Sequence, residues 1–274
     1  MSKGEPRETA CERQGAGPAV ALIHGLGLNR AMWQWQLPAL VPHFEVLSYD
    51  LLGHGESAKP GGTPDLTMFS EQLLRLLDAC GVERAAIVGF SLGGMIARRF
   101  AIDHPDRCRA LVILHSAHDR TRAEREAVRG RVRQARASGP SVTVDAALER
   151  WFTPACRDKN PGLMATVRDW ILANDAAVYP GIYRVLAEGD AEIAAGIASI
   201  SCPTLVMTGG EDSGNTPDMA YRMAKLIPGA RTVILPALRH MAPLEAPEVV
   251  NAHLSAFLLD ALETGRGPVS DSRQ

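Results

Sequence analysis

Gly89-Phe90-Ser91-Leu92-Gly93-Gly94 lies between an apolar run at residues 85–88 and a segment with helical patterning at residues 95–102. This order predicts a buried strand, a one-residue turn and a helix, the context in which the pattern G-x-S-x-G presents a reactive serine. Glycines are needed on both sides of such a turn because a Cβ would collide with the neighbouring strand or helix. Ser91 is therefore predicted to have a strained backbone at the start of a helix, where backbone N–H groups can stabilise a negative charge.

The composition is that of an ordinary globular protein. The chain has 274 residues, 46% of them hydrophobic and 22% charged, and its net charge of −2 gives no electrostatic case for binding nucleic acid or an anionic membrane. The five cysteines are odd in number and form no C-x-x-C pair, so reduced thiols are expected. Residues 1–14 are polar, without the apolar run of a signal peptide, and no stretch elsewhere is long enough to cross a membrane. We therefore expect a cytoplasmic protein.

The order of apolar runs predicts an α/β fold with a mostly parallel central sheet flanked by helices on both faces. Strands are expected at 19–23, 44–49, 85–88, 110–114, 203–208 and 232–235, and helices at 66–80, 95–102, 217–226 and 247–259. Residues 18–115 and 200–262 would form this core. Residues 1–17 would be a polar N-terminal arm, residues 116–199 a helical cap, and residues 263–274, rich in Gly, Ser, Pro and charge, a disordered tail.

The segment 116–199 loses the strand pattern and becomes helical. Residues 120–136 contain seven arginines, whereas the acidic residues in or directly beside this stretch are Asp119, Glu124 and Glu126. These arginines form either a solvated face or a face from which one arginine, with Arg133 as the candidate, reaches inward to hold a substrate carboxylate. Trp151 is a candidate substrate contact, with packing inside the insertion as the alternative.

Three polar residues lie in loops that directly follow strands, and together they can activate a serine. A serine hydroxyl needs a base to remove its proton, and the base needs an acid to orient it. Ser91 follows one strand, Asp212 a later one and His240 the last one, and the carboxyl ends of parallel strands open at one edge of a sheet. Glu211 and Asp119 are alternative acids. His54, His104, His115 and His118 are assigned to surface or capping positions.

Further motifs give a resemblance that spans nearly the whole chain. The chain order Ser, Asp, His and the loop His24-Gly25-Leu26-Gly27 resemble those of α/β-hydrolase-fold serine hydrolases. Asp50-Leu51-Leu52-Gly53-His54-Gly55 is similar to their structural D-x-x-G-x-G turn. Glu149-Arg150-Trp151-Phe152-Thr153-Pro154 and the loop from Gly209 to Pro217 resemble the 3-oxoadipate enol-lactonase-like branch.

The resemblance implies a serine hydrolase that cleaves a small carboxylic ester or (enol-)lactone through an acyl-enzyme. Ser91, Asp212 and His240 would be catalytic, and the amides of Leu26 and Leu92 would form the oxyanion hole. The expected substrate-binding residues are His24, which would also support its loop, with Gly25, Trp151 and Arg133. No metal or cofactor is expected, and the partner would be a small-molecule substrate, with a carboxylated one as a candidate. No nucleic acid or membrane partner is expected, and the chain would be a monomer or homodimer.

Other functions of the same scaffold stay open. Phe90 stands where carbon–carbon bond hydrolases of aromatic degradation usually carry Asn, which disfavours that reaction without removing it. An amidase is a further alternative, and Phe90-Ser91 also resembles cofactor-free perhydrolases. Ser91 argues against dehalogenases and epoxide hydrolases, which carry an acidic residue there. A non-catalytic, hydrolase-like receptor would keep the pocket and turn over slowly or not at all.

Overall fold

A computed structural model describes residues 8–263. Its centre is a seven-stranded sheet of order β1-β3-β2-β4-β5-β6-β7, in which β1 pairs antiparallel with β3 and every other pair is parallel. The predicted α/β class is therefore confirmed. The strands are β1 (Cys11–Gln14), β2 (Ala19–Ile23), β3 (Glu45–Tyr49), β4 (Ala85–Phe90), β5 (Cys108–Leu114), β6 (Thr204–Gly209) and β7 (Arg231–Leu235).

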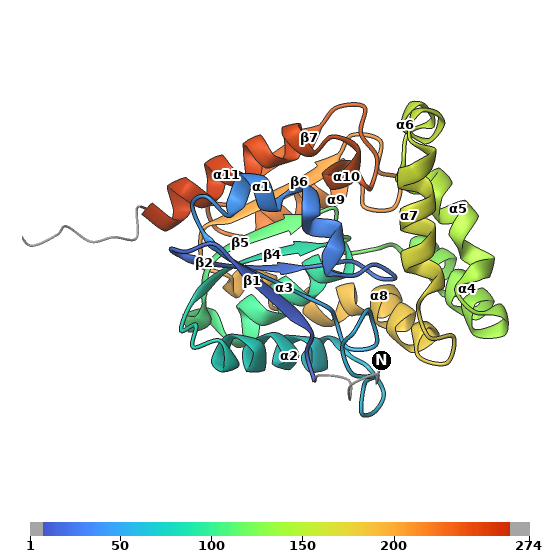
Figure 1. The fold of residues 1–274 in the computed structure, drawn as a ribbon, viewed down its shortest axis with the longest axis horizontal. Helices are drawn as coiled ribbons and strands as arrows, with labels where there is room; N and C mark the ends of the chain where they lie inside the picture. The colour runs from blue at the N-terminus through green and yellow to red at the C-terminus, as the bar shows by residue number, and fades with distance from the viewer. Residues whose placement is uncertain (1–7, 264–274) are drawn as a thin grey trace, which may run out of the picture.

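Helices connect the strands and cover both faces of the sheet (Figure 1). Those before β6 are η1 (Arg30–Trp35), α1 (Leu37–Leu40), α2 (Leu66–Ala79), α3 (Leu92–Asp103), η2 (Pro105–Arg107), α4 (Arg122–Ser138), α5 (Ser141–Trp151), α6 (Pro154–Lys159), α7 (Pro161–Leu172), α8 (Tyr179–Ile193) and η3 (Ile197–Ser199). Those after β6 are α9 (Pro217–Leu226), α10 (Ala242–Glu245) and α11 (Pro247–Glu263). No helix within residues 8–263 has the length and apolar character needed to cross a membrane.

The alternation of side chains along the buried strands divides the core into two layers. Ala21 and Ile23 of β2 pack with α2, α3 and α9, whereas Val20 and Leu22 pack on the other face with α11. All five residues of β2 are buried, as expected for a parallel strand covered on both sides. This packing fixes the strands rigidly, so the loops at their carboxyl ends have defined positions.

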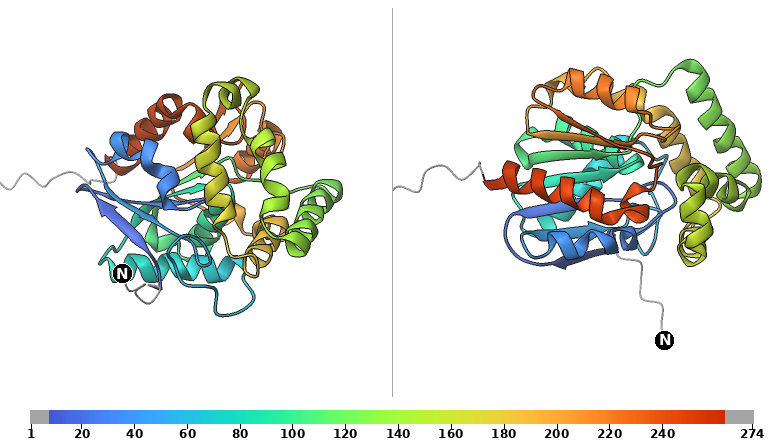
Figure 2. Two further views of the ribbon diagram at one scale, coloured as in Figure 1. Left: turned by 45° about the vertical axis from the view of Figure 1, so that its right-hand side comes forward. Right: turned by 90° about the horizontal axis from the view of Figure 1, so that it is seen from above.

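Helices α4 to α7 gather at the carboxyl edge of the sheet, as two further views show (Figure 2). A capping box between Thr121 and Glu124 starts α4, because the two side chains satisfy N–H groups that the first helical turn leaves unbonded. Helix α8 differs from its neighbours, since it also packs against α3 in the core layer. The insertion between β5 and β6 thus contains both a cover over the sheet edge and the crossover back to the sheet.

Two segments contain elements that were not expected from the sequence, and one prediction lies almost entirely outside the described residues. The polar N-terminal arm contains the strand β1, and the stretch between β2 and β3 contains η1 and α1, which were not predicted. Strand β1 lies at the sheet edge and is mostly exposed, so it lacks the apolar pattern that identifies buried strands. The tail expected at 263–274 falls, from residue 264 on, outside the described residues.

Candidate active site

Ser91 stands at the apex of a tight turn between β4 and α3. Its backbone has φ of 56° and ψ of −112°, a conformation that costs about 1–3 kcal/mol for a residue other than glycine. A Cβ on Gly89 would lie 2.1 Å from the Gly93 carbonyl oxygen, and one on Gly93 would lie 2.2 Å from the Ile23 carbonyl oxygen. Only glycine therefore fits on either side of the serine.

The loop after β2 lies against this serine. A Cβ on Gly25 would be 3.2 Å from the Cβ of Ser91. The next residue, Leu26, has an N–H that is bonded to no acceptor within residues 8–263. Leu92 is the first residue of α3, so its N–H has no acceptor inside the helix. Two backbone donors are thus available in the segments that border Ser91.

Two buried histidines hold the loop after β2 in place. The Nε2 atom of His24 accepts the Leu51 N–H at 2.9 Å, and its Nδ1 lies 2.8 Å from the Gly25 carbonyl oxygen. The Nε2 atom of His54 accepts the Gly27 N–H at 3.0 Å. Burial lowers the pKa of His24 to about 4 and the pKa of His54 to about 3. Both rings are neutral near pH 7, as their acceptor roles require.

His24 therefore supports the loop after β2, and because it is not among the residues that line the cavity, its assignment as a substrate-binding residue is not supported. Its ring is fully buried and both nitrogens are engaged with the backbone. The assignment of His54, His115 and His118 to surface or capping positions is wrong, since all three are buried.

His240, in the loop after β7, is paired with Asp212, in the loop after β6. The His240 Nδ1 atom lies 2.7 Å from Asp212 Oδ2, and Asp212 Oδ1 accepts the N–H groups of Gly214 and Asn215 at 3.1 and 3.0 Å. Burial alone would raise the pKa of Asp212, but His240 and His115 lower it well below its usual range. Asp212 is therefore a fixed carboxylate that orients the His240 ring.

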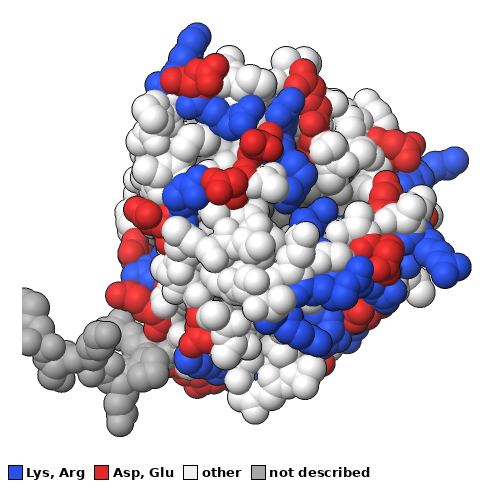
Figure 3. Space-filling view, turned by 90° about the vertical axis from the view of Figure 1, so that its right-hand side faces the viewer, with Lys and Arg blue, Asp and Glu red and all other residues white. Residues whose placement is uncertain are grey.

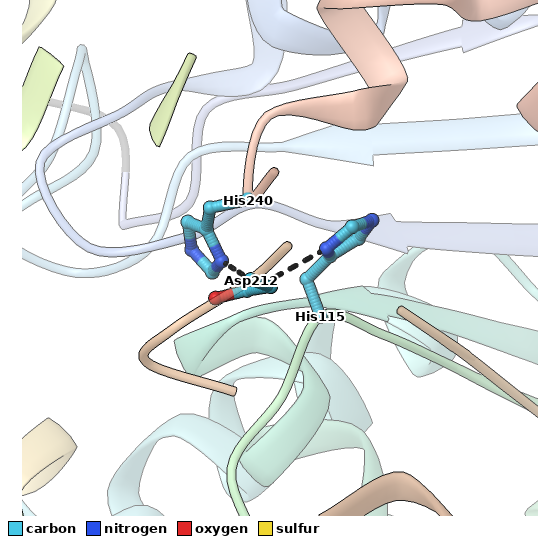
Figure 4. Close-up of side chains that lie close together, drawn as sticks. All are labelled: His115, Asp212 and His240. Atoms are coloured by element: carbon cyan, nitrogen blue, oxygen red, sulfur yellow. Dashed lines mark hydrogen bonds and ion pairs between the residues drawn. The ribbon is translucent and has the colours of Figure 1, made fainter. Parts of the chain in front are cut away.

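A second histidine shares the same carboxylate. His115, directly after β5, places its Nδ1 atom 3.1 Å from Asp212 Oδ2, so the two rings flank Asp212 (Figure 4). His115 is fully buried and has a φ of 48°, and burial lowers its pKa despite the adjacent carboxylate. Sequence reasoning missed this role, although His115 follows a strand at the same sheet edge.

Among residues 8–263, these three side chains are also the one group whose ligand atoms lie close enough together to hold a metal ion. The ligand atoms of His115, Asp212 and His240 lie within 4.8 Å of one another. In the structure the Nδ1 atoms of both rings lie within hydrogen-bond distance of the Asp212 carboxylate, and the His240–Asp212 pair has the arrangement of a general base with its orienting acid.

The alternative acids lie elsewhere. Glu211 is exposed and lies 3.6 Å from Arg239, and Asp119 is exposed and paired with Arg222 at 2.9 Å. Of the three acids considered from the sequence, only Asp212 contacts His240 among the described residues.

One cavity brings the core and the cap residues together. It has a volume of about 80 Å³ and is lined from the core by Gly25, Leu26, Ser91, Asp212 and His240. Trp151 lines it from the cap, with its ring centroid 5.8 Å from that of His240. Within residues 8–263 no hydrogen bond joins the Ser91 hydroxyl to His240, and such bonds often tighten only when substrate is present.

The Arg133 assignment is wrong. Its side chain is 66% exposed and pairs with Glu126 at 2.8 Å. The cap side of the molecule carries a mixture of basic and acidic groups (Figure 3). Arg131, two residues earlier on α4, lines the cavity instead. Successive residues of a helix are about 100° apart, so these two arginines point in roughly opposite directions.

Comparisons with known proteins agree with this geometry. Residues 18–137 match the alpha/beta hydrolase fold family. The chain is 31% identical to (E)-2-((N-methylformamido)methylene)succinate hydrolase of Acinetobacter baylyi, over 89% of this chain and 92% of that protein. It is 27% identical to 3-oxoadipate enol-lactonase 2 of the same organism, over 88% of each chain. The solved enol-lactonase of Burkholderia xenovorans LB400 matches with a TM-score of 0.86 and 29% identity, over 91% of this chain and 96% of that one.

Proposed function

This chain belongs to the alpha/beta hydrolase fold family and is a hydrolase, and we propose that it cleaves a small carboxylic ester or (enol-)lactone through an acyl-enzyme on Ser91. The observation that carries the proposal is the shared cavity. A serine on a strained turn and a histidine bonded to a buried carboxylate line one enclosure. That combination is the set of parts needed for nucleophilic acyl transfer.

In the first half of the proposed reaction, Ser91 Oγ bonds to the substrate carbonyl carbon while His240 Nε2 takes its proton. Asp212 accepts the Nδ1–H of His240 and stabilises the positive charge that forms on the ring. The N–H groups of Leu26 and Leu92 would bind the oxyanion, and one such donor is typically worth about 2.7–4 kcal/mol of barrier.

The bond from the carbonyl carbon to the leaving oxygen then breaks, and His240 Nε2 gives its proton to that oxygen. In the second half, His240 takes a proton from water, whose oxygen attacks the acyl carbon. The bond to Ser91 Oγ breaks, the serine recovers a proton from His240, and the carboxylic acid leaves. In a lactone, the leaving alcohol or enol stays attached to the acyl group throughout, and a single ring-opened acid leaves the enzyme.

The names of the relatives support an acyl substrate of this kind. Three of the matched proteins are named enol-lactonases, which favours the lactone. The A. baylyi relative at 31% identity is named for a substrate with an N-methylformamido group, which makes hydrolysis of a carbon–nitrogen bond the second candidate. An aryl ester and the matching anilide, assayed side by side, separate the two.

Labelling with a fluorophosphonate tests the mechanism directly. Wild-type protein is expected to react at one site, identified as Ser91 by mass spectrometry of the modified peptide. Ser91→Ala should stay folded by circular dichroism, resist labelling and lose about four to six orders of magnitude in turnover. Ser141→Ala is the matched control, because Ser141 is an exposed cap serine outside the cavity. An unlabelled wild type, or near-normal turnover in Ser91→Ala, would refute the proposal.

A further inference from the structure

Three arginines line the cavity from its cap side: Arg120, Arg131 and Arg150. Among the described residues 8–263, a carboxylate partner is found only for Arg120, and it is the fully buried Asp190. The Asp190 Oδ1 atom lies 3.3 Å from Arg120 Nη1, and its Oδ2 accepts the Arg120 backbone N–H at 2.8 Å. The positive charge of Arg120 is therefore paired with a carboxylate inside the protein.

Arg131 and Arg150 are different, because no carboxylate within residues 8–263 lies within 4.0 Å of either guanidinium. The Nε–H of Arg131 donates to the Tyr183 hydroxyl at 3.1 Å, and Arg150 Nη1 donates to the Ala146 carbonyl at 2.7 Å. Since a guanidinium has five N–H donors, most of the donors on both side chains remain for a ligand.

Two unpaired cations in one partly enclosed cavity repel each other. Burial lowers the pKa of Arg150, and the charge of Arg131 lowers it further. Bringing charges out of water without partners is unfavourable, and two carboxylates placed here would offset both the burial and the repulsion. Apolar side chains of Val128 and Ala147 line the same cavity and suit the carbon chain of such a ligand.

We propose that Arg131 and Arg150 form a binding site for two carboxylates, so that the substrate is a dicarboxylic acid carrying the bond that Ser91 cleaves. This inference rests on the proposed function for its reaction, but its binding site stands on the two arginines alone. Each carboxylate accepts two N–H groups from one guanidinium, a geometry specific to arginine. The dicarboxylate binds beneath the cap, and its acyl carbon extends toward the serine.

Binding to the Ser91→Ala variant tests the site without turnover. Calorimetric titrations would use succinate, glutarate and adipate, with the monocarboxylate and the dimethyl ester of each length as controls. We expect the best dicarboxylate to bind at least tenfold more tightly than its monocarboxylate, a difference of about 1.4 kcal/mol. Arg131→Gln and Arg150→Gln should each remove about tenfold or more of that affinity, and Arg150→Lys, which keeps the charge but not the fork, should lose less.

Arg133→Gln is the matched control on the same helix, and its affinity for dicarboxylates should equal that of the parent. Equal binding of dicarboxylate, monocarboxylate and dimethyl ester would overturn the proposal, as would an Arg133→Gln loss as large as that of Arg131→Gln. Circular dichroism of each variant identifies losses caused by unfolding. Labelling at Ser91 without a dicarboxylate preference removes this inference alone. Dicarboxylate binding in a protein that is never labelled removes the proposed reaction alone.

Discussion

Replacing Asp190 by asparagine is expected to lower the free energy of unfolding by about 3–5 kcal/mol, the range for breaking a buried ion pair from one side. Asparagine keeps the shape of the side chain and an oxygen for the Arg120 N–H, but removes the negative charge. Asp190 is fully buried on α8, and its oxygens lie 3.3 Å from Arg120 and 3.6 Å from Arg125. The substitution therefore leaves a nearly buried guanidinium, Arg120, without a counter-charge.

The distances give the magnitude. Two unit charges 3.3 Å apart interact by about 5 kcal/mol at an effective dielectric constant of 20. The charge of Asp190 also supports Arg98, a fully buried guanidinium whose pKa burial lowers to about 9. Structural relaxation and entry of water compensate for part of the lost interaction, so the expected decrease in the free energy of unfolding is about 3–5 kcal/mol. For a chain of this size that corresponds to a fall in Tm of about 6–20 °C.

Differential scanning calorimetry at pH 7 measures the effect. Glu188→Gln is the matched control, because Glu188 lies one half-turn earlier on α8, is one-third exposed and pairs with Arg129 and Arg184. Its Tm should stay within a few degrees of wild type, since exposed pairs contribute about 0–1 kcal/mol. Replacing the pair together, by Asp190→Leu with Arg120→Met, should restore most of the stability. Equal Tm values for Asp190→Asn and Glu188→Gln would refute the reasoning.

Two further results are expected. Burial lowers the pKa values of His24 and His54 to about 4 and 3, below the ordinary value of 6.5. Between the folded-state pKa of each ring and 6.5, the unfolded chain therefore binds more protons than the folded chain. Stability is then complete above about pH 6.5 and falls toward pH 4 by about 1.4 kcal/mol per pH unit for each ring; urea midpoints that stay constant from pH 7 to 5 would contradict this. His115→Leu should lower kcat about 10- to 100-fold at nearly constant KM, since Asp212 loses a charge-assisted hydrogen bond worth about 1.5–3 kcal/mol. His115→Asn, whose amide can replace the Nδ1 donor, should retain most of the rate, and equal rates for the two variants would exclude a positioning role.

The sequence predicts the sheet and the meeting of Ser91, Asp212 and His240, because parallel topology fixes where strand ends lie. The role of His115 is harder to predict. It follows a strand at the same edge as Asp212, but only the contact between the two side chains in the structure shows that His115 helps to position the carboxylate. Strand β1 is missed because an exposed edge strand has no apolar face to reveal it.

The helical periodicity of α4 distinguishes Arg131 from Arg133. Val128, Val132 and Ala135 are the buried residues of α4, and their spacing marks the inward face of the helix. Arg131 lies three residues after Val128 and four before Ala135, on that face, whereas Arg133 lies nearly opposite. The helical period thus identifies the inward arginine. The absence of an acidic partner depends on other helices and cannot be read from α4 alone.

Helix α8 belongs to two parts of the molecule at once. Tyr179 and Tyr183 near its start line the cavity, and Asp190 near its end is paired with the buried Arg120. Tyr179 and Asp190 are eleven residues apart on one helix, a separation of about 16 Å. A rigid-body shift of α8 that widened the cavity would also pull Asp190 away from its buried cation. Because Arg125 of α4 lies 3.6 Å from the same carboxylate, α4 and α8 are coupled through Asp190, and opening of the cavity is expected to leave both helices in place.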